Sequence, residues 1–192
     1  MLGDSLSAWA FAPGSACGSA SGTWPRVLAA MDSGLTLVHN GGVPGNTTSQ
    51  MLARMQHDVL AYRPDVLFVL GGTNDVADDF TVSTTVANIR RIALTATADG
   101  IEVVLLTVPP NDAMRGWELT RLREINAGVL ALGSAQGIVV VDVYAALASA
   151  GGRLPTAYAA ADRLHLNLRG EATLAATVYA ALTAPPARGL AR

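Results

Sequence analysis

The chain has 192 residues, a net charge of −2 and 51% hydrophobic residues, which is enough apolar material for a folded core and argues against intrinsic disorder. The near-neutral charge gives no basic surface for nucleic acid. All 13 basic residues are arginines, so mechanisms that need a lysine, such as Schiff-base catalysis or Walker-type nucleotide binding, are excluded.

Strand and helix patterns alternate along the chain. Only Met1 and Leu2 precede a Gly-Asp-Ser turn, so we expect a truncated first strand in this sequence. Nearly continuous apolar runs favour strands that are buried on both faces, and apolar residues at helical spacing favour helices. In chain order these patterns predict a helix over 24–31, a strand over 35–39, a helix over 48–61, a strand over 66–70, a helix over 82–98, a strand over 101–108, a helix over 114–135, a strand over 138–143 and a helix over 167–182.

This alternation predicts a three-layer α/β/α fold with a parallel sheet. We expect a single domain over residues 1–182, followed by a frayed tail over 183–192. No apolar run reaches the roughly 18 residues of a membrane span, and no signal peptide is visible. As the chain stands we expect no transmembrane segment and a cytoplasmic location, or a secreted or periplasmic one if an upstream segment has been removed.

Polar and glycine-rich blocks follow the predicted strands. They are Gly-Asp-Ser at 3–5, the loop 40–48, the block 71–75 and the block 162–165 before the last helix. Ligands in open α/β sheets bind at the carboxyl ends of the strands, where such blocks meet. We therefore expect the functional site there.

Three residues in these blocks can form a nucleophilic site. A serine hydroxyl needs a base, and His165 can accept the proton of Ser5 near neutral pH. Asp162, three residues before His165, can fix the imidazole tautomer and stabilise the imidazolium. The chain has no G-x-S-x-G motif, so the nucleophile elbow of the α/β-hydrolases is not used.

An oxyanion formed by attack on a carbonyl needs hydrogen-bond donors. The backbone amides of Ser5 and Gly45 and the side-chain amide of Asn74 are the candidates. Together they would form an oxyanion hole.

The blocks also carry a resemblance. GDSLS at 3–7, N-x-G-x-x-G at 40–45, GGTND at 71–75 and DxxH at 162–165 together resemble the SGNH (GDSL-type) serine hydrolase family, in family order and at family-like spacing. The resemblance implies a flavodoxin-like sheet of strand order 2-1-3-4-5. It also implies a nucleophile at Ser5, a triad completed by Asp162 and His165, and an oxyanion hole of Ser5, Gly45 and Asn74. It implies hydrolysis of carboxylic esters or thioesters and no metal or organic cofactor. Family members usually carry several apolar residues before the GDS block, whereas this sequence has two.

Other residues have a structural interpretation beside the functional one. We expect Asp4 to cap the turn or bond neighbouring amides, and Asn40 to brace the loop that presents Gly45. Trp9 either lines an acyl pocket or packs the first helix. Asp142, at a strand end, is a weaker candidate for the triad acid than Asp162. His39 and His57 are interpreted as structural and solvated, respectively, and the histidines are too dispersed for a metal site.

The leading hypothesis is a serine esterase that hydrolyses short-chain acyl or acetyl esters through an acyl-enzyme on Ser5, with a small-molecule ester as its partner. The alternatives are a lysophospholipase- or thioesterase-type lipid acyl hydrolase, a sugar-acetyl esterase, and a binding module of the same fold that has lost catalysis. A flavin or nucleotide binder has no supporting motif. The sequence leaves the oligomeric state open.

Overall fold

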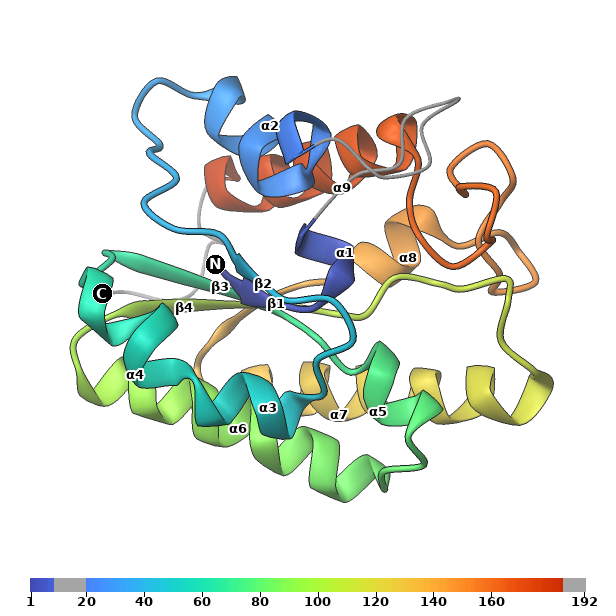
Figure 1. Cartoon of the computed structure of the whole chain (residues 1–192), viewed down its shortest axis with the longest axis horizontal. Helices are drawn as coiled ribbons and strands as arrows, with labels where there is room; N and C mark the ends of the chain where they lie inside the picture. The colour runs from blue at the N-terminus through green and yellow to red at the C-terminus, as the bar shows by residue number, and fades with distance from the viewer. Residues whose placement is uncertain (9–19, 185–192) are drawn as a thin grey trace.

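The computed structural model describes residues 1–8 and 20–184, which form a five-stranded sheet between two layers of helices (Figure 1). Every neighbouring pair of strands is parallel, and the strand order is β2-β1-β3-β4-β5. The structure thus confirms the expected three-layer α/β/α fold with strand order 2-1-3-4-5.

The central strands are short and apolar. In chain order the strands are β1 (Leu2–Gly3), β2 (Gly41–Gly42), β3 (Val66–Leu70), β4 (Glu102–Leu106) and β5 (Val139–Val141). The run that forms β3, and that of β4 after its exposed first residue Glu102, is continuously hydrophobic because helices cover both faces of the sheet there. β1 has only two residues, as the sequence indicated.

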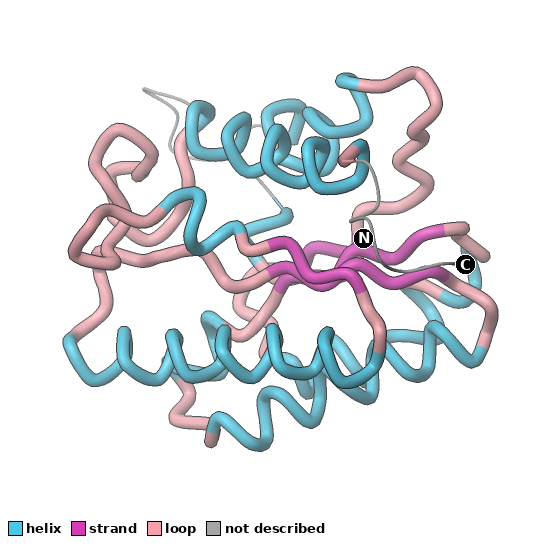
Figure 2. Tube along the Cα trace, turned by 180° about the vertical axis from the view of Figure 1, so that it is seen from behind, coloured by secondary structure: helices cyan, strands magenta, loops and turns pink. Residues whose placement is uncertain are grey.

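Each face of the sheet has its own helical layer, and Figure 2 shows the two layers from behind. One layer contains α1 (Ser5–Ala8), α2 (Trp24–Met31), α8 (Val143–Leu147) and α9 (Leu168–Thr183), with the short 3-10 turn η1 (Ala20–Gly22) before α2. The other contains α3 (Thr48–Ala53), α4 (Met55–Asp58), α5 (Thr73–Ala77), α6 (Val82–Ala98) and α7 (Gly116–Gln136), with η2 (Leu60–Tyr62) after α4.

The predicted strand over 35–39 is wrong. The strand beside β1 is Gly41–Gly42, and pairing begins where the amino group of Met1 donates to the carbonyl of His39 (3.1 Å) and the Gly41 amide donates to the carbonyl of Met1 (2.9 Å). Residues 35–38 come before this point and have no β1 residue opposite them. They keep the alternating burial of an extended segment without its ladder.

The helix predicted over 48–61 is three separate pieces, α3, α4 and η2. The backbone leaves helical geometry at Arg54 (φ −102°, ψ 9°) and at Val59 (φ −126°, ψ −66°). The apolar spacing was nevertheless a sound guide to burial, because Met51, Met55 and Val59 are all buried.

The last helix runs one residue further than predicted. α9 begins after Asn167, whose side chain accepts hydrogen bonds from the amides of Arg169 and Gly170 (both 3.0 Å), and it includes Thr183. Thr183 was expected in the frayed tail, and residues 185–192 of that tail lie outside the described part of the chain. No helix among the described residues is long and apolar enough to cross a membrane.

Candidate active site

The polar blocks of the sequence meet at the carboxyl edge of the sheet. Ser5 is the first residue of α1 and comes directly after the turn that ends β1. Asn74 lies in α5 after β3, and Gly45 lies in the loop between β2 and α3. β3 passes into α5 through Gly72, whose φ of +128° is a conformation that side-chain-bearing residues rarely adopt.

Ser5, His165 and Asp162 form a continuous hydrogen-bonded line. The Nε2 atom of His165 lies 2.8 Å from Ser5 Oγ, and its Nδ1 atom lies 2.7 Å from an Asp162 carboxylate oxygen. Serine and histidine are 160 positions apart in the chain. The structure therefore brings together the three residues that the sequence analysis singled out, with one imidazole nitrogen facing the hydroxyl and the other facing the acid.

Asp162 also organises the loop that carries the histidine. Its other carboxylate oxygen accepts hydrogen bonds from the backbone amides of Leu164 (3.0 Å) and His165 (2.9 Å). Burial raises the pKa of this carboxyl, but the hydrogen bonds from His165 and Leu164 outweigh burial and hold the pKa below its usual value. Asp162 is therefore a carboxylate at neutral pH.

A second acid, which the sequence analysis missed, holds this loop from outside. Arg163 lies between Asp162 and His165 in the left-handed conformation (φ 62°). Its guanidinium donates to the Asp112 carboxylate (Nε to Oδ2 2.8 Å), and its carbonyl accepts from the Asp112 amide (3.0 Å). Arg153 approaches the same carboxylate at 3.3 Å. Hydrogen bonding and charge from Arg163, and to a smaller extent from Arg153, lower the pKa of Asp112. Asp112 is about fifty residues away in sequence, and no local pattern marks it.

The other candidate oxyanion donors come from two further segments, the loop before α3 and helix α5. Gly45 is exposed with φ +76°, and a Cβ added there would meet no atom within 4 Å. The Asn74 side-chain nitrogen donates to the carbonyl of Asn46 (2.9 Å) and makes a longer contact of 3.4 Å with Asp4 Oδ2. The first bond fixes the amide beside the loop that carries Gly45, and the second N–H is only weakly engaged.

Asp4 lies buried beneath this site. Its carboxylate accepts a hydrogen bond from the Leu6 amide (2.9 Å), which matches the expected local role in the turn. Burial raises its pKa to about 7, with the charge of Asp75 adding to the shift. Asp75 is itself buried and accepts from the Thr48 amide (2.9 Å) and the Thr85 hydroxyl (3.2 Å), as expected for a structural carboxylate.

Asn40 joins the candidate oxyanion loop, defined as residues 40–48 with Gly45 in it, to helix α1. Its side-chain nitrogen donates to the carbonyl of Ser7 (2.8 Å), and its side-chain oxygen accepts from the Gly42 amide (3.1 Å). These contacts join β2 to α1, and the role of Asn40 in bracing the loop that presents Gly45 stays a prediction. Trp9, the other candidate near the nucleophile, lies outside the described residues.

Arg54 is a further residue that the sequence analysis did not identify. Its guanidinium donates to Asn46 Oδ1 (2.7 Å), to the carbonyl of Gly41 (2.6 Å) and to the carbonyl of Gly3 (2.6 Å), and it pairs with Asp58. One side chain thus ties both ends of the oxyanion loop to the strand that precedes Ser5. The signal was hidden because Arg54 falls inside an apolar helical pattern, where an arginine is normally a solvated residue.

The remaining candidates stay outside the site. The His39 ring stacks on Tyr62 with 4.1 Å between ring centroids, and His57 is highly exposed beside Asp58. Asp142 caps α8 by accepting from the Ala145 amide (3.1 Å), so it is not the acid that faces His165. Within residues 1–8 and 20–184, no group of three or more His, Cys, Asp or Glu side chains is placed to hold a metal ion.

Residues 1–173 match the GDSL-like Lipase/Acylhydrolase family. The chain belongs to this family. The match covers all four motif blocks, so the resemblance seen in the sequence is confirmed.

Individual relatives are more distant. An arylesterase of Vibrio mimicus is 31% identical over 120 residues, which is 60% of this chain and 57% of that protein. An uncharacterized lipoprotein, YqeF, of Bacillus subtilis is 39% identical over 54 residues, 28% of this chain and 22% of that protein. The match thus spans just over half of the length of the arylesterase and about a fifth of the length of the lipoprotein.

Solved structures share the fold. A putative lipolytic protein of the G-D-S-L family from Desulfitobacterium hafniense superposes with a TM-score of 0.81 at 20% identity. The superposition covers 94% of this chain and 96% of that one. At this identity the likeness is one of fold.

Proposed function

We propose that this protein is a serine esterase that hydrolyses short-chain carboxylic esters through an acyl-enzyme on Ser5. The observation that carries the proposal is the hydrogen-bonded line from Ser5 Oγ through His165 to Asp162. Membership of an acylhydrolase family supports the same reaction class.

In the first half-reaction, Ser5 Oγ attacks the ester carbonyl carbon while His165 Nε2 takes the hydroxyl proton. Asp162 holds the imidazole tautomer through Nδ1 and stabilises the imidazolium that forms. The carbonyl oxygen becomes an oxyanion, which the amides of Ser5 and Gly45 and the weakly engaged N–H of Asn74 stabilise. In a protease, removal of one such donor lowers kcat by roughly 10²- to 10³-fold.

Collapse of this tetrahedral intermediate breaks the bond to the alcohol, and His165 returns its proton to the leaving oxygen. Water then attacks the acyl-serine with His165 again as the base. A second collapse releases the carboxylic acid and restores the Ser5 hydroxyl. No step needs a metal or an organic cofactor.

The substrate is proposed as a small ester with a short acyl chain. The Vibrio mimicus relative bears the name arylesterase, which supports a small ester as the substrate. Long-chain lysophospholipids, acyl-CoA thioesters and acetylated sugars are the competing substrates.

The test is a hydrolysis profile on p-nitrophenyl esters from acetate to palmitate, with wild type and Ser5→Ala side by side. We expect the highest kcat/KM on acetate or butyrate and a loss of at least about a thousandfold in Ser5→Ala. A wild-type optimum on palmitate, or a higher kcat/KM on acyl-CoA or acetyl-xylose, would replace the proposed substrate. Full activity in Ser5→Ala would overturn the mechanism.

A further inference from the structure

The helix that carries Ser5 is too short to hold its own position. Ser5 is the first residue of α1, which has only four residues (Ser5–Ala8). A helix of one turn gains too few hydrogen bonds of its own to be stable, so contacts with other elements fix where it lies. The distance of 2.8 Å between Ser5 Oγ and His165 Nε2 therefore depends on what holds α1.

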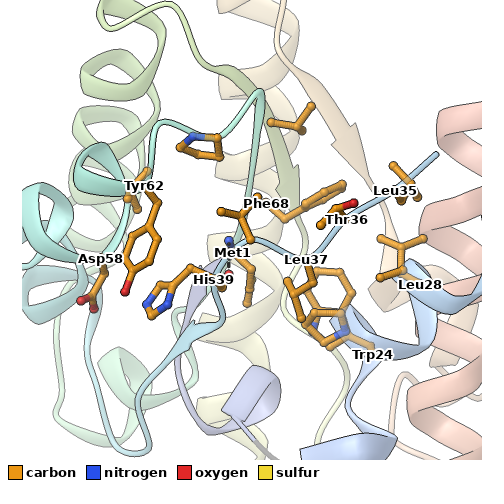
Figure 3. A pocket seen from close by; sticks show the side chains of 16 residues that line it. Met1, Trp24, Leu28, Leu35, Thr36, Leu37, His39, Asp58, Tyr62 and Phe68 are labelled. Carbon is orange, nitrogen blue, oxygen red and sulfur yellow. Dashed lines mark hydrogen bonds between the residues drawn. The ribbon is translucent and has the colours of Figure 1, made fainter. Parts of the chain in front are cut away.

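A buried tryptophan holds the middle of this helix. Trp24, the first residue of α2, and Ser7 are both completely buried, and the indole Nε1–H donates a hydrogen bond to Ser7 Oγ (3.2 Å). The indole ring also meets Phe68 of β3 edge to face, with 5.9 Å between the ring centroids, and Figure 3 shows both side chains. Because the indole is rigid and has a single donor, this hydrogen bond fixes the Ser7 side chain relative to α2.

The same tryptophan is tied to α9 through its backbone. The first N–H groups of a helix have no acceptor within that helix, and in α2 one of them finds an acceptor on another helix. The amide of Trp24 donates to a carboxylate oxygen of Glu171 (2.7 Å), which is buried in the first turn of α9. Figure 1 shows α2 and α9 side by side over the sheet. Trp24 thus has a hydrogen bond to α1 and another to α9.

The start of α9 is in turn attached to the loop that carries the base. Asn167, two residues after His165, caps α9, and its side-chain nitrogen donates to the carbonyl of Ala159 (3.0 Å) in the segment that leads into this loop. Glu171 lies one turn further along the helix. The contacts of Trp24 therefore connect the segment that carries the base with the helix that carries the nucleophile.

Buried polar groups in this layer cost stability that apolar ones would not. Burial raises the pKa of the Glu171 carboxyl well above its usual value, and the hydrogen bond from the Trp24 amide opposes only part of this shift. A hydrophobic side chain at position 171 would avoid the cost of burying a carboxyl group. A buried hydrogen-bond network, however, fixes one arrangement of the elements that it joins. This network is therefore better suited to setting a distance than to adding stability.

We propose that Trp24 is a positioning residue for the attack on the ester: it holds Ser7, and with it Ser5, at attack distance from His165, while Glu171 fixes Trp24 itself. This inference rests on the proposed function. Trp24 acts through α1 and not on the substrate, so its loss should change the rate of the chemical step and not the binding of the ester. Misplacement of a reacting group by about 1 Å can cost about 10²-fold in rate.

The test is a double-mutant cycle on p-nitrophenyl acetate with Trp24→Phe, Ser7→Ala and the double variant. Phenylalanine keeps an aromatic ring without the N–H, and alanine removes the acceptor. We expect kcat to fall about ten- to a hundredfold in each single variant, with KM within about twofold of wild type. The double variant should lose no more than either single variant, because both changes remove the same hydrogen bond.

Two controls separate positioning from stability. Ser49→Ala makes the same change at an exposed serine. Phe68→Leu loosens the packing on the indole ring but leaves the hydrogen bond to Ser7, so it should lower Tm and keep the wild-type kcat. The link to α9 is tested by Glu171→Leu, which removes the acceptor of the Trp24 amide, beside Glu171→Gln, which keeps a carbonyl oxygen there. We expect kcat to fall further in Glu171→Leu than in Glu171→Gln.

Wild-type kcat in Trp24→Phe and Ser7→Ala, additive losses in the double variant, or an equal loss of kcat in Phe68→Leu would overturn the proposal. Equal kcat in the two Glu171 variants would overturn the part assigned to α9. If Trp24→Phe does not fold, the comparison of Ser7→Ala with Ser49→Ala decides the proposal. A wild type without hydrolysis that depends on Ser5 would overturn the proposed function itself, and this inference with it, so the two failures are distinguishable.

Discussion

At the scale of single residues, the two carboxylates nearest Ser5 differ in role because their surroundings differ. Asp162 is partly exposed, and hydrogen bonds that favour its charged form surround it. Asp4 is fully buried, and burial raises its pKa to about 7. The surroundings thus shift the pKa values of these two carboxyl groups in opposite directions. This favours Asp162 as the partner of His165 and leaves Asp4 a structural role.

The raised pKa of Asp4 predicts a pH-dependent cost to stability. Between its unfolded value of 3.8 and its folded value of about 7, the native protein holds a proton that the unfolded chain has lost. The free energy of unfolding should therefore fall as pH rises through this window, and level off above it. Asp4→Asn has no such proton, so its unfolding free energy relative to wild type should rise from pH 4 to pH 8. Urea unfolding at several pH values gives both free energies, and a difference between Asp4→Asn and wild type that stays constant from pH 4 to pH 8 would contradict the assignment.

Arg54 predicts an effect on turnover that goes through the oxyanion loop. Lysine at this position cannot reach Asn46, Gly41 and Gly3 at once, so in Arg54→Lys the loop should lose its fixed position. We expect kcat on p-nitrophenyl acetate to fall about ten- to a hundredfold with little change in KM. Arg91→Lys, at an exposed position on α6, is the matched control and should retain wild-type values.

A double-mutant cycle separates this role from a general loss of stability. If Arg54 acts by positioning the oxyanion donors, the effect of Arg54→Lys on kcat should shrink in an Asn74→Ala background. Fully additive effects, or a drop in Tm that accounts for the lost activity, would show that Arg54 only supports the fold.

At the scale of elements, loops carry the site and the strands only position them. The loop with His165 is held against the segment around Asp112 by the Arg163 ion pair and by a backbone hydrogen bond. The loop with Gly45 is held by Asn40 and Arg54. Sequence motifs identify the residues that face Ser5, whereas these anchors come from distant segments and have no motif.

The anchor on the histidine loop is tested by Asp112→Asn. The variant removes the negative charge that the Arg163 guanidinium binds, so the histidine loop should be held less firmly, and we expect kcat to fall several-fold while Tm stays within about 2 °C. Asp79→Asn breaks a comparable ion pair with Arg121, far along the chain from the triad, and should leave kcat unchanged. Equal activity in both variants would show that the loop keeps its shape without Asp112.

At the scale of the whole molecule, alternation of apolar runs and helical spacing was enough to predict the layers, the parallel sheet and the edge that carries the site. It failed at residues 35–39, because strand formation there depends on a neighbouring strand and not on the apolar run itself. It also merged three short helices into one around Arg54, since the apolar period continues through the breaks. Long-range contacts such as Arg163 with Asp112 could not be predicted, because only the folded topology brings them together.

The central claim is that Ser5 is the nucleophile, and covalent labelling tests it most directly. Wild type, Ser5→Ala and the exposed-site control Ser49→Ala are treated with diisopropyl fluorophosphate, and the adduct is mapped by tandem mass spectrometry of the tryptic peptides. We predict one adduct per chain on Ser5 in wild type and in Ser49→Ala, and none in Ser5→Ala. An adduct on another residue, or folded wild-type protein that remains unlabelled, would contradict the account.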